Sequence, residues 1–444
     1  MSAIGKVLHQ MGFKVSGSDL KENSNTIRLK DLGIKVAIGH DASLLRDADL
    51  LIYSSAVPRD NIELLGAAAK KIPVLKRAEM LSWIMNRFKK RIAVAGTHGK
   101  TTTTSMISKI LYDGGMDPTY LIGGETDYVD GNARLGAGEL AVAEADESDG
   151  SFLELSPTIS IVTNIEPDHM EYFGSNENLF SVFESFIDRL ETDGLLILGV
   201  DNPGSRSLLS KIGKKKMTYG VSTDAEIRAL NLSFDWLSSR FEVYHLGKLL
   251  GEVRLSIPGE QNIENSLAAV AAGLTVGVPF SSMVTALRSF VGARRRFQII
   301  GEEREVMVID DYAHHPTEIK ATLQAARLAF EGKKRIIAVF QPHRYTRTFH
   351  LANQFGDAFN DADVVILTDI YSAGESPIPG VDGKTIAAEV EKYRGVTYIP
   401  RKEHIAERLL KIVKPNDVVI TMGAGDINTV NKELLSRLKL KHEA

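Results

Sequence analysis

The sequence contains no cysteine among its 444 residues. Disulfide frameworks, thiolate zinc sites, iron–sulfur clusters and cysteine nucleophiles are therefore excluded, and any metal must be bound by oxygen or imidazole. A chain without cysteine also fits a reducing cytoplasm.

Long apolar runs and an excess of charge of either sign are missing as well. The most apolar stretch, residues 266–280, is shorter than the roughly 18–20 residues that span a bilayer, and residues 1–11 lack the pattern of a secretory leader. The 53 Lys and Arg residues nearly balance the 57 Asp and Glu residues, which leaves no overall field for nucleic acid or an anionic membrane. We therefore expect a soluble cytoplasmic protein that binds small molecules and has neither nucleic acid nor membrane as a partner.

What the chain does contain is an alternation of short β-branched runs with stretches of helical period. This pattern is typical of an α/β protein whose parallel sheets are covered by helices on both faces. Residues 317–330 are predicted to form one of these helices, and residues 240–255 alternate like a small antiparallel sheet. The predicted strands are residues 14–16, 50–53, 92–95, 140–145, 159–163, 195–200, 306–309, 336–340, 364–369 and 418–421.

The length of 444 residues predicts about three domains at roughly 150 residues each. Basic stretches at residues 87–91 and 292–297 each precede a predicted strand, and they suggest the two boundaries. The predicted domains are residues 1–90, 91–296 and 297–444.

The sharpest local signal is Ala-Val-Ala-Gly-Thr-His-Gly-Lys-Thr-Thr at residues 93–102, a predicted strand, a glycine turn and a helix that ends near Tyr112. This layout is typical of a phosphate-binding loop, in which backbone N–H groups and the helix N-terminus surround an anion. The match to G-x-x-x-x-G-K-[ST] is imperfect, since Val94 stands at the first glycine position and the glycine is Gly96. The alternative is a glycine turn that merely precedes a helix. We favour ATP or GTP binding, because strand, turn, Gly-Lys-Thr and helix occur in that order. The predicted nucleotide-binding residues here are Gly96, Thr97, His98, Gly99, Lys100, Thr101 and Thr102.

Two later strand ends carry polar side chains that suit a metal. Residues 144–149 read Glu-Ala-Asp-Glu-Ser-Asp, and residues 163–169 read Thr-Asn-Ile-Glu-Pro-Asp-His. The Thr101 hydroxyl is a ligand for Mg²⁺ in such loops, and a carboxylate from a neighbouring strand would complete the site. Glu144 and His169 are the candidates; a solvated acidic loop and a structural histidine are the alternatives.

In the last third of the chain, four successive predicted strands each end in polar residues. They are followed by residues 310–315, 341–347, 369–371 and 423–426. Ligands of open parallel sheets bind outside the carboxyl ends of the strands. Arg344 and Arg347 are suited to hold a carboxylate or phosphate through paired hydrogen bonds.

Taken together, these motifs resemble those of the Mur ligases, the ATP-dependent ligases of peptidoglycan precursor synthesis. The resemblance rests on the motifs at residues 96–101, 144–149, 163–169, 310–316, 340–347 and 423–427, and it covers all three predicted domains. Within the family the motifs are most similar to those of the enzymes that join L-alanine to UDP-N-acetylmuramate. The implied fold has an N-terminal Rossmann-like UDP-binding domain, a central ATPase domain with a parallel sheet plus a small antiparallel sheet, and a C-terminal Rossmann-like domain.

The resemblance implies roles for individual residues. Lys100 and Thr101 would hold phosphates and Mg²⁺, Glu144 would bind a magnesium ion, and His169 would bind a second metal ion; Mn²⁺ is an alternative to Mg²⁺. Asn262 and Asn265 would lie near adenine, Arg296 at the γ-phosphate and Asp311 at the ribose. Four residues would surround the reacting carboxylate and the alanine: Tyr312, His314, Arg344 and Arg347. The expected catalytic set is Lys100, Glu144, His169, Arg296, His314, Arg344 and Arg347.

The sequence departs from the family pattern at Gln261, where histidine is usual, and at Arg294, where glycine is common. The family also opens with a strand and a Gly-x-Gly-Gly-x-Gly turn that holds the UDP diphosphate, and here the sequence begins at Met1-Ser2-Ala3-Ile4. We expect a start assigned too far downstream and weakened binding of the UDP-sugar. Later parts of the UDP site remain at Ser18, Asp19, Ser54 and Ser55.

The chemistry implied by the resemblance is formation of an acyl phosphate from ATP and the UDP-N-acetylmuramate carboxylate, followed by attack of the neutral amine of L-alanine. The products would be UDP-N-acetylmuramoyl-L-alanine, ADP and phosphate. The alternatives are a murein peptide ligase that joins a recycled peptide to the same sugar, folylpolyglutamate synthase, and a non-catalytic nucleotide-binding relative. Folylpolyglutamate synthase would not explain the remaining UDP-site residues.

Overall fold

The computed structural model describes residues 1–126, 131–221 and 224–443, with side chains described as far as residue 440. The chain divides into two compact units. The first comprises Met1–Glu166, Glu177–Tyr219 and Ala268–Met283, and the second comprises Pro167–Asn176, Gly220–Leu267 and Val284–Ala444. This division does not test the predicted domain boundaries, which stay a prediction.

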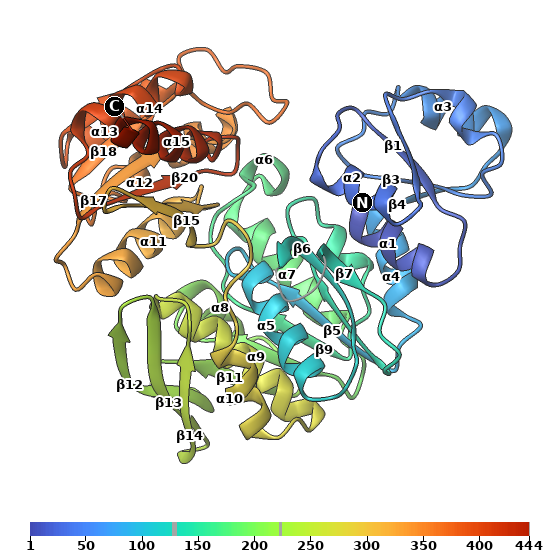
Figure 1. Cartoon of the computed structure of the whole chain (residues 1–444). Helices are drawn as coiled ribbons and strands as arrows, with labels where there is room; N and C mark the ends of the chain where they lie inside the picture. The colour runs from blue at the N-terminus through green and yellow to red at the C-terminus, as the bar shows by residue number, and fades with distance from the viewer. Residues whose placement is uncertain (127–130, 222–223, 444) are drawn as a thin grey trace. The chain divides into compact units, whose positions relative to one another are not determined.

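The N-terminal part of the first unit contains two small parallel sheets (Figure 1). Strand β1 (Ser16–Asp19) pairs with β2 (Lys35–Ile38), and β3 (Leu51–Tyr53) pairs with β4 (Val74–Lys76). The accompanying helices are α1 (Ser2–Gln10), α2 (Ser24–Asp31), η1 (Ala42–Leu45), α3 (Ile62–Lys70) and α4 (Arg77–Met85).

The strand predicted at residues 50–53 is confirmed, whereas the one predicted at 14–16 is wrong in its position. Strand β1 begins at Ser16 and reads Ser-Gly-Ser-Asp, a sequence without hydrophobic residues. Its backbone pairing with β2, rather than its side chains, defines it as a strand.

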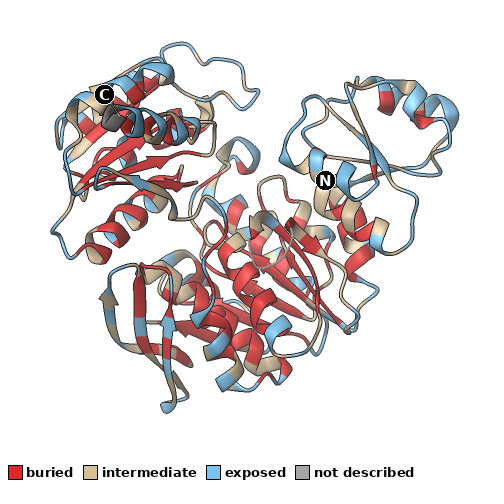
Figure 2. Cartoon of the chain, viewed as in Figure 1, coloured by how far each residue is buried: buried red, intermediate tan, exposed pale blue. Residues whose placement is uncertain are grey.

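The central sheet of the first unit has the order β11-β10-β9-β5-β8-β6-β7. All neighbouring strands described in this sheet are parallel except β6 and β7, which are antiparallel. Residues 92–95 of β5 are fully buried, and Figure 2 shows that the interior of the sheet is buried in general. Its strands are β5 (Lys90–Ala95), β6 (Thr119–Thr126), β7 (Gly131–Arg134), β8 (Leu140–Glu144), β9 (Ile159–Val162), β10 (Leu195–Gly199) and β11 (Lys216–Gly220). The parallel sheet predicted from the buried apolar runs is therefore confirmed.

Helices complete this part of the chain, and α5 (Lys100–Asp113) directly follows β5, as predicted. The first unit also contains η2 (Ser151–Glu154), α8 (Pro203–Ser207) and η3 (Leu208–Ser210). Helix α6 (Met170–Phe173) belongs to the second unit, and α7 (Asn176–Asp188), α9 (Glu260–Val276) and α10 (Phe280–Arg288) each have residues in both units.

In the second unit, β12 (Ile227–Asp235), β13 (Ser238–His245) and β14 (Lys248–Leu255) are antiparallel. Buried Phe241 and Val243 alternate with less buried neighbours along β13, which is the pattern of a sheet with one covered face. The antiparallel sheet predicted over residues 240–255 is thus confirmed, and β12 extends it.

The second unit also contains a six-stranded sheet of order β15-β16-β20-β17-β18-β19. Its strands are β15 (Gln298–Glu303), β16 (Val306–Asp311), β17 (Arg335–Phe340), β18 (Val364–Leu367), β19 (Val396–Tyr398) and β20 (Asp417–Met422). Only β15 is antiparallel to its neighbour, so the carboxyl ends of the other strands meet at one edge. Two buried apolar clusters involve alternate residues of these strands, together with the helices α11 (Pro316–Ala329), α12 (Tyr345–Phe355), α13 (Gly383–Glu391), α14 (Ile405–Ile412) and α15 (Thr429–Glu443). The short helix η4 (Lys402–His404) precedes α14 and has no buried residue.

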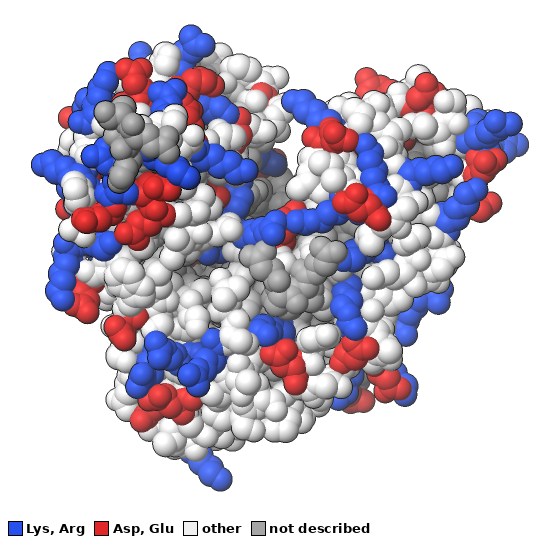
Figure 3. Space-filling view, in the orientation of Figure 1, with Lys and Arg blue, Asp and Glu red and all other residues white. Residues whose placement is uncertain are grey.

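On the surface, Figure 3 shows Lys and Arg interspersed with Asp and Glu over the face in view. Among the described residues, no helix combines the length and the hydropathy needed to cross a membrane.

Gly96 is required by the turn after β5. Its φ is +134°, and a Cβ added there would lie 2.0 Å from Thr163 Oγ1. Gly96→Ala should therefore lower the free energy of unfolding by about 2–4 kcal/mol, through backbone strain and the clash with Thr163, which follows β9.

Urea unfolding followed by circular dichroism measures this effect. Gly115→Ala is the matched control, because Gly115 has a φ of +77° and nothing within 4 Å of the added Cβ. Equal midpoints for the two variants would contradict the steric explanation.

Candidate active site

The loop between β5 and α5 is held by the residues that follow β9. The backbone N–H of His98 donates to Asn164 Oδ1 at 2.8 Å, and that of Thr97 donates to the Asn164 carbonyl at 3.1 Å. The Thr163 hydroxyl donates to the His98 carbonyl at 2.6 Å, and Gly99 stands before α5 with a φ of +80°. The loop is thereby fixed as a glycine turn at a helix N-terminus, the geometry that binds phosphate.

Lys100 lies folded back over this loop. Its Nζ donates to the carbonyls of Gly96 at 2.6 Å and Thr97 at 3.0 Å, and to Glu147 Oε1 at 2.8 Å. Burial works against the charged form, but Glu147 and Glu144 raise the pKa of Lys100 above its ordinary value. Lys100 is therefore a cation held at the loop. Sequence reasoning missed Glu147 as its partner, because four acids in six residues gave no means of choosing among them.

Thr101 and Glu144 are brought together, as the prediction of a shared metal site requires. The Thr101 hydroxyl lies 3.1 and 3.0 Å from the two carboxylate oxygens of Glu144, and Gly123 N donates to Glu144 Oε2 at 2.8 Å. A hydroxyl beside a carboxylate is a set of hard oxygen donors, which is what Mg²⁺ prefers. The side chains present thus fit the metal.

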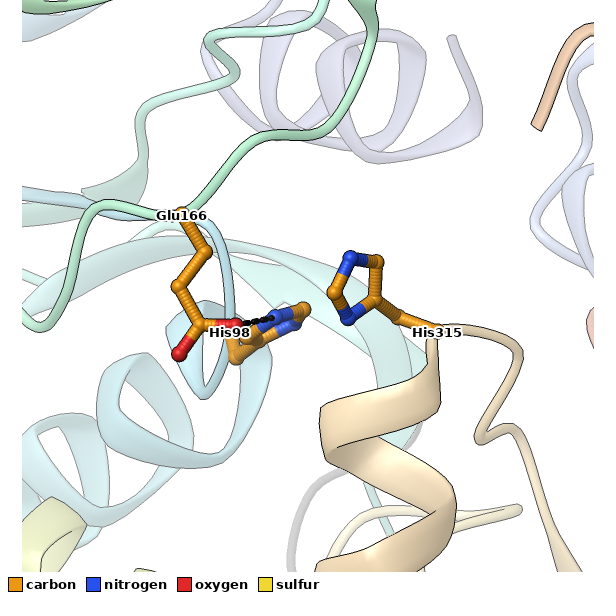
Figure 4. A group of neighbouring side chains, drawn as sticks. All are labelled: His98, Glu166 and His315. Carbon is orange, nitrogen blue, oxygen red and sulfur yellow. Dashed lines mark hydrogen bonds and ion pairs between the residues drawn. The ribbon is translucent and has the colours of Figure 1, made fainter. Parts of the chain in front are cut away.

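His98 has a defined partner from the chain after β9. Its Nε2 lies 3.3 Å from Glu166 Oε2, the contact marked by the dashed line in Figure 4. Glu166 is held in turn by Asn202 Nδ2 at 3.0 Å and by Thr97 Oγ1, which accepts from its backbone N–H at 2.9 Å. His315, also drawn, belongs to the second unit, where it precedes α11 and accepts from Thr317 N through Nδ1. Of the predicted loop residues, Thr102 is buried in the first turn of α5.

The four residues predicted to contact UDP lie at or after the ends of β1 and β3. Ser18 donates to Glu63 Oε1 at 2.7 Å and its hydroxyl is 3.0 Å from His40 Nδ1. Asp19 ends β1 and accepts from the backbone N–H of Lys21 at 3.2 Å. Ser54 and Ser55 follow β3 in a turn. Glu63 and His40 were not predicted, because no sequence pattern links residues 40 and 63 to Ser18.

In the second unit, His169 precedes the short helix α6 with a left-handed φ of +54°. Its Nε2 is 3.6 Å from Asp168 Oδ2 and its Nδ1 is 3.5 Å from Glu171 Oε1. The His169 imidazole with the neighbouring Glu171 carboxylate is a donor set that fits a divalent metal.

Asp311 is buried at the end of β16. Its two carboxylate oxygens accept from the backbone N–H groups of Phe297 at 2.8 Å and Ala313 at 2.7 Å, and burial raises its pKa to about 6 despite the nearby charge of Arg296. Arg296 lies 5.2 Å from the centroid of the Tyr312 ring. The structure therefore brings Arg296, Asp311 and Tyr312 together.

Asn262 and Asn265 lie in the first turns of α9. Asn265 Nδ2 is 3.5 Å from Asn262 Oδ1, while Asn262 Nδ2 donates to the Pro258 carbonyl at 2.7 Å. The two amides are neighbours, as their spacing of three residues predicts for a helix.

His314, Arg344 and Arg347 gather at the carboxyl edge of the six-stranded sheet. Arg344 Nη1 donates to Glu171 Oε1 at 2.9 Å, and Arg347 donates from Nε to Asp168 Oδ1 at 3.1 Å. These acids were not predicted as partners of the arginines, because only the fold brings residues 168–171 to α12. The structure places His314, Arg344 and Arg347, and their roles in catalysis and substrate binding stay predictions.

A cleft of about 360 Å³ opens at the same edge, beyond the ends of β17, β18, β19 and β20. Its position is the one where open parallel sheets bind ligands. It is lined by Gln341, Thr368, Asp369, Ile370, Tyr371, Ser372, Pro400, Arg401, Lys402, Glu403 and Asp426.

Comparison of the chain with protein families gives three matches. Residues 1–89 match the family described as "Mur ligase family, catalytic domain", residues 94–273 the "Mur ligase middle domain", and residues 295–425 the "Mur ligase, glutamate ligase domain".

Individual relatives match over nearly the whole chain. UDP-N-acetylmuramate--L-alanine ligase of Pelotomaculum thermopropionicum is 48% identical over 99% of this chain and 95% of its own length, and that of Geotalea uraniireducens is 46% identical over 99% and 96%. The crystal structure of UDP-N-acetylmuramate-alanine ligase MurC from Thermotoga maritima is similar with a TM-score of 0.84 and 31% identity, covering 99% of this chain and 97% of that one. The three-domain α/β architecture expected from the sequence is therefore confirmed, and the chain belongs to the Mur ligase family.

Proposed function

We propose that this chain ligates L-alanine to the carboxylate of UDP-N-acetylmuramate, with hydrolysis of ATP to ADP and phosphate, in the synthesis of peptidoglycan precursors. The observation that carries the proposal is the arrangement of Lys100, Thr101 and Glu144 around a phosphate loop. It occurs in a chain whose full-length relatives bear the name of this ligase. The proposal includes a cytoplasmic location and domains of residues 1–90, 91–296 and 297–444.

In the first step, the carboxylate of the sugar attacks the γ-phosphorus of ATP and gives an acyl phosphate and ADP. The loop N–H groups and Lys100 would hold the phosphates, and Thr101 and Glu144 would hold Mg²⁺. When bound, Mg²⁺ supplies positive charge against the phosphate oxygens. Catalysis of this step consists of positioning and electrostatic stabilisation, so no nucleophilic side chain is required.

In the second step, the neutral amine of L-alanine attacks the acyl carbon, and phosphate leaves as the amide forms. Arg296 lies beside Tyr312, and we assign it to the γ-phosphate and later to the departing phosphate. Arg344, with a third of its side chain exposed, and His314 are assigned to the alanine. His169 is assigned to a second metal ion near the reacting carboxylate.

The proposed reaction predicts that phosphate release depends on both substrates. Release should be rapid with ATP, UDP-N-acetylmuramate and L-alanine together, and at least about 10²-fold slower when either acceptor is omitted. A coupled phosphate assay measures it. Turnover with a tripeptide in place of free L-alanine would instead identify a murein peptide ligase, and binding of ATP without turnover would identify a non-catalytic relative.

Lys100→Ala should lower kcat by about 10³-fold or more, because a charge over the transferred phosphoryl group is lost at the transition state. The same assay measures kcat, and a thermal unfolding curve checks that the variant is folded. Lys89→Ala is the control, since the Lys89 side chain is 75% exposed and pairs only with exposed Glu139 among the contacts described for it. Near-parental turnover of the Lys100 variant would contradict the assignment.

Glu144→Gln should raise the Mg²⁺ concentration needed for half-maximal activity by about 10- to 100-fold, because a charged metal ligand becomes neutral. His169→Ala should shift the same Mg²⁺ titration. Glu139→Gln removes an exposed carboxylate of the same unit and serves as the control. If the Mg²⁺ titration of the Glu144 or the His169 variant superimposed on that of the parent, the substituted residue would not be a metal ligand.

A further inference from the structure

Asp168 and Arg347 form a buried, paired contact within the second unit. Arg347 Nε donates to Asp168 Oδ1 at 3.1 Å and Nη2 donates to Oδ2 at 3.2 Å, with the two residues 6% and 8% exposed. The two groups form an ion pair with two parallel hydrogen bonds, and each neutralises the other in a place where an unpaired charge is costly.

The guanidinium of Arg347 also contacts His343, through the nitrogen Nη1 that does not bind Asp168. Nη1 lies 3.2 Å from His343 Nδ1 and 3.3 Å from the His343 carbonyl. A guanidinium has donors and no acceptor, so Nδ1 of His343 must accept. An imidazole that accepts at Nδ1 is neutral and carries its proton on Nε2.

Two further features keep His343 in this state. Its ring stacks on Tyr371 with centroids 5.7 Å apart and an interplanar angle of 8°. Burial, followed by the nearby His314, Arg347 and Arg344, lowers the pKa of His343 to about 3. At neutral pH His343 is thus a fixed hydrogen-bond donor through Nε2.

The neighbouring His314 is held in the opposite tautomer. Its Nδ1 is 2.9 Å from the Tyr312 carbonyl, and because a carbonyl only accepts, Nδ1 carries the proton. Burial lowers the pKa of His314 to about 4, so its Nε2 is a free-base acceptor at neutral pH. The two ring centroids are 5.8 Å apart. One ring offers a donor and its neighbour an acceptor, which matches an amino acid that carries a carboxylate and an amine.

We propose that Asp168 is a positioning residue, which acts through Arg347 to hold His343 as its Nε2–H tautomer, and that this Nε2–H donates to the carboxylate of the amino-acid substrate. The proposal rests on the proposed ligase function for the identity of the substrate. It gives Arg347 an indirect role, since the paired donors that would otherwise bind a substrate carboxylate are already bound to Asp168. Arg344 remains as the arginine for direct contact.

Histidine labelled with ¹⁵N in the full chain tests the first half of the proposal without any enzyme assay. Long-range ¹H–¹⁵N correlations distinguish the two tautomers, and the signal lost in His343→Gln identifies His343. We expect Nε2–H in the parent and a mixture of tautomers in Arg347→Met. Because that variant leaves the charge of Asp168 buried, the double variant Asp168→Asn with Arg347→Met, which removes both charges, is measured as well. An Nδ1–H tautomer in the parent, or an unchanged signal in both folded variants, would overturn the proposal.

Kinetics of two His343 variants test the second half. The side-chain oxygen of Asn reaches the position of Nδ1 and can still accept from Arg347, but Asn has no donor near Nε2. The amide nitrogen of Gln reaches the position of Nε2. His343→Asn should raise KM for L-alanine by about 10- to 100-fold and leave KM for ATP within about twofold, while His343→Gln should restore part of the loss.

Equal KM values for L-alanine in the two variants, or a change confined to KM for ATP, would refute contact between His343 and the amino acid. Asp168→Asn keeps an oxygen that can accept from the backbone N–H of His169, a bond of 2.8 Å in the parent. Its Mg²⁺ titration should therefore superimpose on that of the parent, and a shifted titration would assign Asp168 to the metal site instead. If the parent chain showed no ligation at all, the proposed function would fail while the tautomer experiment still decided the role of Asp168.

Discussion

The position of the loop after β5, which we propose binds phosphate, depends on the hydrogen-bonded order of three parallel strands, β8, β5 and β9. Val94 of β5 pairs with Glu144 of β8, and Ala95 pairs with Val162 of β9. Because parallel strands end at the same edge, the loop after β5 is flanked by a carboxylate on one side and by Thr163 and Asn164 on the other. The contacts of Thr101 with Glu144 and of His98 with Asn164 follow from this register. A glycine is needed at position 96 for the same reason, since Thr163 occupies the space that a side chain would fill.

Several buried charges among the described residues form ion pairs close to strand ends. Lys100 is bound to Glu147, Arg347 to Asp168, and Arg295 to Asp310 at 2.9 Å. Arg295 also donates to the carbonyls of Gly423 and Gly425, which ties the segment before β15 to the loop after β20. Since a desolvated charge is stable only with its partner, each acid fixes the orientation of a cation at the site. The electrostatics of these sites and the stability of the fold therefore rest on the same contacts.

The sequence was sufficient to predict the elements whose own residues specify them. Strands β5, β9 and β17 can be recognised from their β-branched runs, because a parallel sheet that is buried on both faces requires apolar side chains. The turn before α5 can be recognised from its glycines. Strand β1 was misplaced, because its Ser-Gly-Ser-Asp sequence is defined by pairing with β2. Among the site residues, Thr101 with Glu144 could be predicted from strand ends. The pairs Glu147–Lys100 and Asp168–Arg347 could not be predicted from the sequence. Their members are 47 and 179 residues apart, and only the tertiary structure brings them into contact.

The arrangement around Lys100 also explains why a divalent cation suits this loop. Lys100 and the N-terminus of α5 supply positive potential, but Glu144 and Glu147 lie against the same turn and oppose the approach of a triphosphate. Lys100 makes an ion pair with Glu147, so little of its charge is left uncompensated in these contacts. A cation bound between the Thr101 hydroxyl and the Glu144 carboxylate would turn that acid from a repulsive group into a ligand. Under the proposed function, the same carboxylate would weaken binding of the bare nucleotide and strengthen binding of its metal complex, which predicts that nucleotide affinity and metal affinity are coupled.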